Sequence, residues 1–359
     1  MISAGIEPVG LACVRRDRPD PAHYVGSGKV EEIRCLAAAA DAGFVIFDAA
    51  LTPAQQRNLE QALDCWVLDR TALILYIFSQ RARSREGKLQ VELAQLDHLS
   101  TRLVRGWSHL ERQRGGLGKT GGPGEKQIEL DRRMIGVRVK QLRERLKQLE
   151  RQRRTRRRAR ARRDVLSVSL VGYTNAGKST LFNALTRSGA YTADQLFATL
   201  DTTARRCFLG DGVGAVISDT VGFIRGLPHS LIAAFKSTLD ETAEADLLLH
   251  VVDAASSARA EQMTEVDRVL DEIGAADVPR LVVYNKIDLT GRAAAVERDR
   301  CDNIVSVSVS AQEGLGLDLL RSAIAEFSQR LSASPVSAGS AADHSVDSHS
   351  LPTAAATQA

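Results

Sequence analysis

The sequence of 359 residues contains few cysteines, few aromatic residues and no long uninterrupted apolar run. No apolar run approaches the roughly 18 residues of a membrane span, and residues 1–11 lack the basic start and apolar core of a signal peptide. Scattered cysteines without a C-x-x-C pair argue against a disulfide framework or a zinc site and favour a reducing compartment. The cysteines are Cys13, Cys35, Cys65, Cys207 and Cys301. We therefore expect a cytoplasmic protein without stable membrane insertion.

The composition is otherwise ordinary for a globular protein, with 44% hydrophobic and 26% charged residues. A chain of this length can form two domains and connecting segments. The net charge is only +4, but residues 151–163 contain nine arginines and no acidic residue. Such a block favours an anionic partner, whether RNA, DNA or an acidic lipid surface, through salt-sensitive and largely sequence-independent contacts.

A phosphate-binding pattern lies near the middle of the chain, where residues 167–180 read SVSLVGYTNAGKST. A short apolar strand leads to Gly172, four residues separate it from Gly177, and Lys178 and Ser179 follow, as in G-x-x-x-x-G-K-[ST]. Glycines let backbone amides ring a phosphate, and the start of the next helix adds partial positive charge. We expect Lys178 to reach the β- and γ-phosphates and the Ser179 hydroxyl to ligate Mg²⁺.

Three further motifs end predicted strands: DTVG at residues 219–222, NKID at 285–288 and SAQ at 310–312. Asp219 can hold Mg²⁺ through a water molecule, and the Gly222 amide can sense a γ-phosphate. Asp288 can accept two hydrogen bonds that guanine offers and adenine does not, so adenine would leave a buried carboxylate unpaired. A backbone amide of the SAQ motif would face the guanine carbonyl. The order of these motifs indicates a guanine-nucleotide site.

The segment FATLDTT, residues 197–203, lies between the loop helix and the next strand. One of its threonines should close over Mg²⁺ in the triphosphate state and withdraw after hydrolysis. The spacing alone leaves Thr199, Thr202 and Thr203 open. Phe223 follows DTVG where many GTPases have a water-orienting glutamine, which predicts slow intrinsic hydrolysis unless another group helps.

The apolar patterns predict an α/β protein with three structured regions and a tail. Residues 1–85 alternate strands (44–47, 66–68) with helices (30–40, 53–63, the latter capped by Thr52), which predicts a small parallel α/β domain. Residues 86–163 carry two heptad seams, interrupted at Ser100 and Arg132, which predict an antiparallel helical hairpin. The seam residues are Leu89, Leu93, Leu96, Leu103, Trp107 and Leu110 in the first helix and Ile128, Ile135, Val139, Leu142, Leu146 and Leu149 in the second. Residues 164–331 alternate strands and helices, as in a P-loop GTPase domain with a mostly parallel sheet. Residues 332–359 are expected to be a disordered tail.

Within residues 164–331 the expected strands are 165–171, 207–209, 214–219, 247–253, 281–285 and 304–310, and the expected helices are 179–187, 231–244, 260–273 and 316–331. Two glycine-rich stretches have alternative interpretations. GGLGKTGGPG at 115–124, with Lys119, Arg112 and Arg114, would probe RNA or be a flexible connector. GSGK at 26–29 would bind an anion at a helix N-terminus or be a plain turn.

The motifs GYTNAGKSTLFN, FATLD, DTVGFIR, NKID and SAQ, with LQVELAQL, RLVRGW and GPGE upstream, resemble the HflX family of translational GTPases over about residues 24–331. The resemblance implies association with the large ribosomal subunit and its rRNA, with the hairpin near the peptidyl-transferase centre. It implies splitting of stalled or stressed ribosomes or a role in subunit assembly, and ATP as a ligand of the N-terminal domain in some members. It also implies a strand before residue 1 and, in many members, a further C-terminal domain.

In the family pattern, Thr199 joins Ser179 as a Mg²⁺ ligand, and Lys178, Thr199 and Gly222 are the expected catalytic residues. Asn175 would help to hold K⁺, as in a related K⁺-activated group of GTPases, or is an ordinary loop residue. We expect a monomer. The alternative function is a nucleotide-gated RNA-binding or assembly factor whose hydrolysis is incidental. The residues expected to bind GTP or GDP are Gly172, Tyr173, Thr174, Asn175, Ala176, Gly177, Lys178, Ser179, Thr180, Phe197, Ala198, Thr199, Leu200, Asp201, Asp219, Thr220, Val221, Gly222, Asn285, Lys286, Ile287, Asp288, Ser310, Ala311 and Gln312.

Overall fold

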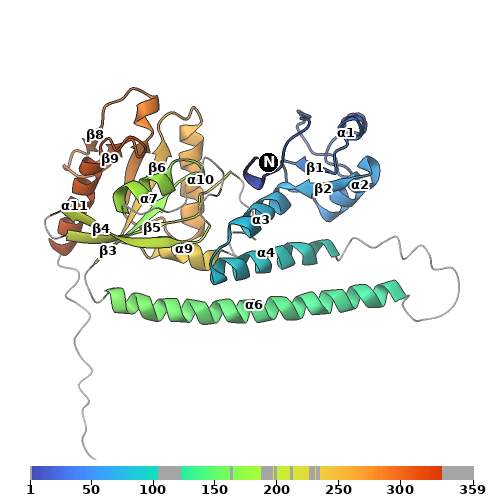
Figure 1. Cartoon of the computed structure of the whole chain (residues 1–359), viewed down its shortest axis with the longest axis horizontal. Helices are drawn as coiled ribbons and strands as arrows, with labels where there is room; N and C mark the ends of the chain where they lie inside the picture. The colour runs from blue at the N-terminus through green and yellow to red at the C-terminus, as the bar shows by residue number, and fades with distance from the viewer. Residues whose placement is uncertain are drawn as a thin grey trace, which may run out of the picture.

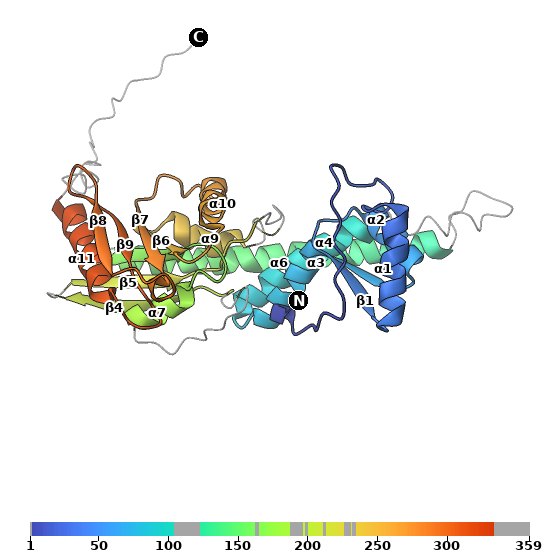
Figure 2. The ribbon, with the colours of Figure 1, turned by 90° about the horizontal axis from the view of Figure 1, so that it is seen from above.

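The computed structural model describes residues 2–103, 123–161, 165–186, 197, 200–210, 213–225, 231 and 235–333. Two α/β units lie at opposite ends of the molecule, and a pair of long helices runs along them (Figure 1, Figure 2). A parallel α/β unit, an antiparallel helical pair and a second, mostly parallel sheet confirm the predicted fold class. Within the described residues, no helix combines the length and apolarity of a membrane span.

The N-terminal unit is built on two parallel strands that pair from Phe44↔Trp66 to Phe47↔Asp69. As predicted, Thr52 caps a helix: its Oγ1 accepts from Gln55 N at 3.2 Å, and Gln55 Oε1 accepts from Thr52 N at 3.0 Å. These reciprocal bonds satisfy donors that a helix start leaves unpaired. The elements are η1 (Ile2–Ala4), α1 (Ser27–Ala39), β1 (Phe44–Phe47), α2 (Pro53–Leu63) and β2 (Trp66–Asp69).

Helix α1 begins earlier than the sequence patterns predict. It starts at Ser27 with Gly26 as its N-cap, so the GSGK stretch forms the first helical turn rather than a loop before the helix. Lys29 Nζ lies 2.8 Å from a carboxylate oxygen of Glu32, one turn further on. This ion pair along the helix gives Lys29 an anionic partner within the chain.

Helix α3 (Arg70–Arg81) follows β2 directly and was missed by the sequence patterns. Asp69 caps this helix, with its Oδ1 accepting from Ala72 N at 2.8 Å. Residues 72–78 are apolar throughout, so the sequence lacks the alternation of polar and apolar residues that marks a surface helix, although one side of α3 carries most of the buried side chains. The buried residues are Thr71, Ile74, Leu75, Ile77 and Phe78.

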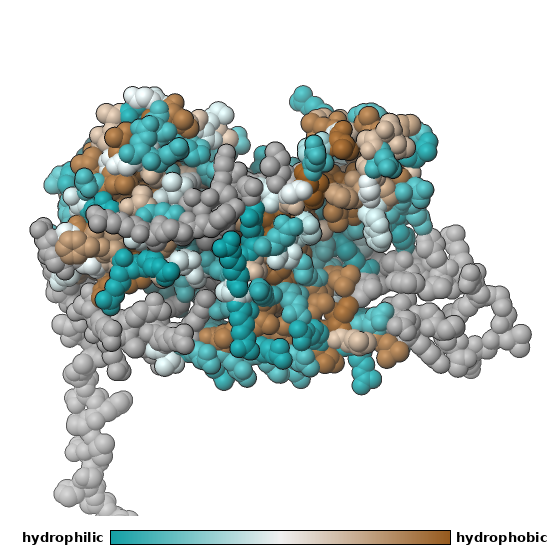
Figure 3. All heavy atoms as spheres, in the orientation of Figure 1, coloured by the Kyte–Doolittle hydropathy of each residue, from teal (hydrophilic) through white to brown (hydrophobic). Residues whose placement is uncertain are grey.

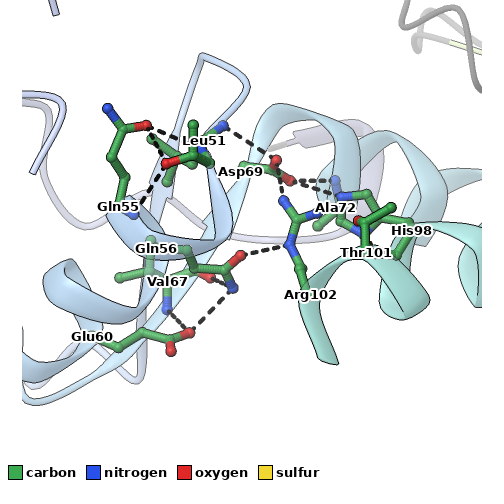
Figure 4. A network of polar contacts seen from close by, with 11 residues as sticks. Leu51, Gln55, Gln56, Glu60, Val67, Asp69, Ala72, His98, Thr101 and Arg102 are labelled. Atoms are coloured by element: carbon green, nitrogen blue, oxygen red, sulfur yellow. Dashed lines mark hydrogen bonds and ion pairs between the residues drawn. The ribbon is translucent and has the colours of Figure 1, made fainter. Parts of the chain in front are cut away.

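Asp69 also fastens the following helix, α4 (Arg85–Leu103), to the N-terminal unit (Figure 4). Arg102 of α4 donates from Nη2 to Asp69 Oδ2 at 2.6 Å and from Nε to Gln56 Oε1 at 2.7 Å. Because Asp69 is only 2% exposed, removal of Arg102 would leave a buried carboxylate with fewer partners. The C-terminal end of α4 is therefore held by the N-terminal unit.

Helices α4 and α6 (Pro123–Ala161) run in opposite directions and form what we call the arm (Figure 1, Figure 2). Ion pairs flank their contact: Arg138 lies 2.6 Å from Glu92, and Arg143 lies 3.2 Å from Asp97. The apolar seam between the helices consists of residues that the heptad pattern predicted, namely Leu89, Leu93, Leu96, Ile135, Val139, Leu142 and Leu146. The pairing of these two seams explains the hairpin.

Helix α6 starts at Pro123, so the end of the glycine-rich stretch belongs to the helix, with proline in the first turn. The rest of that stretch, with Arg112, Arg114 and Lys119, lies outside the described residues, as do the predicted seam residues Trp107 and Leu110. At its other end, α6 continues into the arginine block as far as Ala161.

The outward side of the arm carries apolar as well as basic residues. Leu130, Met134 and Val137 are spaced by one helical turn and are 52%, 68% and 52% exposed. Apolar surface is visible along the arm in Figure 3. An exposed apolar surface of this kind favours a partner that makes apolar as well as ionic contacts.

The C-terminal unit contains a seven-stranded sheet with the order β4-β5-β3-β6-β7-β9-β8. The five central strands are parallel, and the edge strands β4 and β8 are antiparallel to their neighbours. The strands are β3 (Leu166–Val171), β4 (Thr203–Gly210), β5 (Val213–Asp219), β6 (Leu247–Asp253), β7 (Arg280–Asn285), β8 (Ala295–Arg298) and β9 (Ile304–Ser308). The short and mostly exposed β8 was not predicted, and β4 is longer than expected.

Helices cover both faces of this sheet. One face packs against α7 (Lys178–Thr186) and α11 (Leu317–Ala333), and the other packs against α9 (Lys236–Ala243) and α10 (Arg259–Glu272). The apolar cluster under α9 and α10 continues into α3 and α4 without a break, so these two helices share a core with the C-terminal unit, whereas the N-terminal unit has its own cluster around Leu59 and Val67. All the parallel strands end on the same edge, which is where ligands bind in such folds.

His250 is a polar residue in the middle of the central strand β6 and is 3% exposed. Burial lowers its pKa to about 4, although Asp267 opposes this shift. The unfolded chain therefore binds a proton between pH 6.5 and 4 that the folded chain does not bind, and stability falls as the pH drops through this window.

We predict that the free energy of unfolding falls by about 2 to 3 kcal/mol less between pH 7 and pH 4.5 in His250→Val than in the wild type. The reason is that valine has no proton to bind in the unfolded state. Urea unfolding followed by circular dichroism at the two pH values measures this difference. Above about pH 8 the histidine is neutral in both states, so the two proteins should show the same pH dependence there. An unchanged acid slope in the variant would contradict the prediction.

Candidate nucleotide-binding site

The phosphate loop turns sharply between β3 and α7. Gly172 has φ +150°, and a Cβ there would lie 2.3 Å from the Val251 carbonyl oxygen. Gly177 has φ +92°, and a Cβ there would lie 2.2 Å from Asn285 Nδ2. Both glycines are therefore required by backbone conformation and by close approach. The loop ends at Lys178, the first residue of α7, so the helix start faces the space that the loop surrounds.

Lys178 is buried under the loop. Its Nζ donates to the carbonyl oxygens of Gly172 at 3.1 Å and Tyr173 at 2.9 Å. Burial lowers its pKa to about 8, and the nearby carboxylate of Asp219 partly offsets this effect. A phosphate group beside this ammonium would supply the anionic partner that the protein provides only in part.

Asn285 joins two parts of the site that are distant in sequence. Its Nδ2 donates to the Ala176 carbonyl at 2.9 Å, and its Oδ1 accepts from Ala311 N at 3.0 Å. Asn285 is 2% exposed, so both bonds are shielded from water. The side chain thus braces the phosphate loop against the SAQ segment, a role that the sequence patterns did not assign.

The far end of the site carries an unsatisfied acceptor. Asp288 Oδ1 is buried, and none of the described residues offers it a hydrogen bond. A buried carboxylate oxygen without a donor is costly unless a ligand supplies one. Beside it, Lys286 adopts φ +63° and its Nζ donates to Asp253 Oδ2 at 2.8 Å. Asp253 was missed from the sequence, although its place at the end of β6 was a usable signal.

Ser310 fixes the SAQ segment next to Asp288. It is fully buried, its amide donates to the Leu315 carbonyl at 3.0 Å, and its Oγ accepts from Glu313 N at 3.2 Å. A tight turn therefore follows β9. Ala311 N is engaged by Asn285, whereas Gln312 is exposed at the turn.

Oxygen ligands suited to a divalent cation meet at the other end of the loop. Ser179 Oγ donates to Asp219 Oδ2 at 2.6 Å, and Thr203 of β4 pairs with Asp219 of β5. A hydroxyl beside a carboxylate fits the hard-oxygen preference of Mg²⁺. Thr199 and Ala198 lie outside the described residues, so the choice among the threonines stays a prediction.

The DTVG motif is tied to the phosphate loop by its backbone. Phe223 N donates to the Gly172 carbonyl at 3.1 Å, and Thr174 N donates to the Phe223 carbonyl at 2.8 Å. A Cβ on Gly222 would lie 2.8 Å from Thr174 Cγ2 and 2.9 Å from Lys178 Nζ. The Phe223 ring is fully buried in the core shared with α3 and α4. It therefore points away from any position where it could orient water.

Three family models match the chain in succession: a GTP-binding GTPase N-terminal region over residues 1–79, a GTP-binding GTPase middle region over residues 81–160, and a 50S ribosome-binding GTPase over residues 167–286. The GTPase HflX of Escherichia coli (strain K12) is 54% identical over 325 residues, which cover 90% of this chain and 76% of that protein. The chain belongs to the HflX family of GTPases. The predicted family and the predicted GTPase activity are thereby confirmed.

Other HflX relatives agree. The GTPase HflX of Magnetococcus marinus is 50% identical over 322 residues, covering 89% of this chain and 74% of that protein. Among solved structures, a GTP-binding protein from Sulfolobus solfataricus in complex with GDP is 24% identical, with a TM-score of 0.47 over 88% of this chain and 89% of that one.

The buried Lys178 of this HflX protein predicts proton uptake when a nucleotide binds. Without a bound nucleotide, Lys178 has a pKa of about 8 and is half neutral at pH 8. The phosphates of a bound nucleotide should restore its positive charge. We therefore expect GDP binding to take up about half a proton at pH 8 and much less at pH 7.

Calorimetric titration in two buffers of different ionisation enthalpy counts these protons. The matched control is Lys178→Gln, which should bind GDP more weakly and show no difference between the two pH values. Equal proton counts at pH 7 and pH 8 for the wild-type protein would refute the linkage.

Proposed function

We propose that this protein is a GTP-hydrolysing factor that docks on the large ribosomal subunit through its arm and splits stalled or stressed ribosomes or aids subunit assembly. The observation that carries the proposal is the joining of a guanine-type site to a cationic two-helix arm through one apolar core. The match of residues 167–286 to 50S ribosome-binding GTPases supports the choice of partner.

The arm supplies the contacts for rRNA. Helix α6 continues into the arginine block of residues 151–163, whose positive charges would displace phosphate counterions. The apolar stripe of Leu130, Met134 and Val137 would add contacts that do not depend on salt. The glycine-rich stretch, which links α4 to α6 in the sequence, would contact the subunit near the peptidyl-transferase centre.

At the site itself, Lys178 would hold the β- and γ-phosphates and the Gly222 amide would contact the γ-phosphate. Ser179 and Thr199 would ligate Mg²⁺ directly, and Asp219 would hold it through water. Mg²⁺ when bound offsets the charge that develops on the phosphates. The chain positions these groups through the tight turns at Gly172 and Gly177. Because Phe223 cannot orient water, hydrolysis should be slow without a partner.

Base recognition rests on Asp288, whose buried Oδ1 would accept from the guanine ring. We predict that Asp288→Asn lowers affinity for GDP roughly a hundredfold and raises affinity for XDP, since an amide matches xanthine and leaves guanine donors unpaired. Competition binding with both nucleotides measures the exchange. Asp277→Asn, at an exposed position away from the site, should leave the preference unchanged. Retained GDP affinity in Asp288→Asn would contradict the assigned contact.

Ribosome dependence separates the proposed function from its alternative. We predict that large ribosomal subunits raise multiple-turnover GTP hydrolysis at least about tenfold, because docking would order the segments around the γ-phosphate. Co-sedimentation with subunits should be stronger with a non-hydrolysable GTP analogue than with GDP and should weaken at higher salt. Nucleotide-dependent binding without stimulated hydrolysis would instead favour an RNA-binding or assembly factor whose hydrolysis is incidental.

A monovalent cation is a second candidate helper for hydrolysis. Asn175 is exposed on the phosphate loop with φ +64°, which leaves its side chain available for K⁺. Running the same reactions in K⁺ and in Na⁺ tests this, and equal rates would end the K⁺ proposal. ATP binding by the N-terminal unit stays a prediction. In this structure, Lys29 of the GSGK stretch pairs with Glu32.

A further inference from the structure

The first turn of the arm contacts the segment that leads to the metal end of the site. Asp201 Oδ2 accepts from the backbone amides of Arg83 at 2.8 Å and Ser84 at 2.7 Å, and its Oδ1 accepts from Ser84 Oγ at 2.5 Å. Ser84 Oγ in turn accepts from Gly87 N at 2.8 Å and so caps α4. The carboxylate of Asp201 therefore sits at the positive end of this helix.

Gly87 makes this contact possible. A Cβ on Gly87 would lie 2.0 Å from Asp201 Oδ1, closer than any real contact. The conflicting atom is the end of a side chain, so a larger residue at position 87 would push the carboxylate away without disturbing the backbone of α4. Glycine in a helix normally costs stability, which gives this one a reason to be there.

A second contact holds the other end of the same segment. Phe197 packs edge-on against Phe78 of α3, with ring centroids 4.7 Å apart and an interplanar angle of 86°. Phe78 meets Phe235, beyond the DTVG motif, in the same way at 5.0 Å. Phe197 has φ +58°, a conformation that a bulky residue adopts only when its surroundings hold it there.

The anchored segment ends at the metal side of the site. Thr203, two residues after Asp201, pairs with Asp219, whose Oδ2 accepts from Ser179 Oγ. Only Thr202 separates the residue held by the arm from the residue beside Asp219. The position of this segment relative to the metal ligands is thus set from outside the GTPase domain as well as from within it.

We propose that Ser84 and Gly87 are positioning residues for GTP hydrolysis, acting through Asp201 to hold residues 200–203 beside Asp219 at the Mg²⁺ side of the site. The proposal rests on the proposed role of Thr199, which directly precedes these residues in the sequence, in binding Mg²⁺. It makes the start of the arm part of the hydrolytic apparatus, although no arm residue touches the nucleotide.

Gly87→Ala tests this proposal in the full-length protein. With loss of the Asp201 contact, ribosome-free kcat should fall about ten- to hundredfold, as is typical when support for a metal ligand is removed. The Mg²⁺ concentration for half-maximal rate should rise, while GDP affinity measured without Mg²⁺ should not change. The melting temperature should change little, because alanine favours a helix over glycine while the contacts of Asp201 with Arg83 and Ser84 are lost. A merely structural role would lower the melting temperature without changing the Mg²⁺ dependence.

Two comparisons complete the test. Gly136→Ala places alanine at an open position in α6, where no atom lies within 4 Å of the new Cβ, and should hydrolyse GTP as the wild type does. Ser84→Ala should lose activity as Gly87→Ala does, and Ser84→Thr, which keeps the hydroxyl, should restore it. If Gly87→Ala hydrolyses GTP at or above the wild-type rate with unchanged Mg²⁺ dependence, the proposal is overturned.

Thr199→Ala distinguishes failure of this inference from failure of the function on which it rests. If Thr199→Ala raises the Mg²⁺ concentration for half-maximal rate and Gly87→Ala does not, the segment binds the metal but the arm does not position it. If neither variant raises this concentration, the role proposed for the segment is itself wrong. Because these assays contain no ribosomes, their outcome does not depend on the proposed partner.

Discussion

The nucleotide site depends on one buried amide that bridges two loops. Asn285 bonds to Ala176 in the phosphate loop and to Ala311 after the last strand, so the spacing between phosphate-binding and base-binding groups is set by a single rigid side chain. Gly177 must lack a Cβ for Asn285 to approach. A guanine nucleotide spans a fixed distance, and a site with this brace is already shaped for it, so little of the binding free energy is lost to ordering.

The second constraint is the shared apolar core. Residues of α3 and α4 pack in one cluster with residues of the segments that flank the phosphate end of the site, including Leu200, Val221 and Phe223. Phe223 occupies the place where a catalytic side chain would be useful, yet its burial stabilises this junction. At position 223 the chain therefore has a buried phenyl ring packed against α3 and α4 instead of a side chain that could orient water. The slow intrinsic hydrolysis that we predict and the packing of α3 and α4 against Phe223 would then have one structural cause.

Motifs whose function depends on local backbone geometry could be recognised from the sequence. The phosphate loop, the heptad seams and the Thr52 cap act within a few residues, so spacing alone describes them. Helix α3 could not be recognised, because residues 72–78 are all apolar and the sequence therefore shows no helical period there. The contact between Asp201 and Ser84 joins residues 117 positions apart, and neither residue is unusual in its own segment. Only the fold brings them together.

Coupling between the arm and the site must act in both directions. If the first turn of α4 holds the segment beside Asp219, then a partner that bends or shifts the arm changes the free energy of placing that segment at the metal. Thermodynamic linkage then requires that nucleotide and metal binding alter the arm's affinity for the partner by the same factor. The opposite end of α4 is fixed to the N-terminal unit through Arg102 and Asp69. Because α4 is held at both ends, a partner that shifts the arm would act on the Asp201 contact as well.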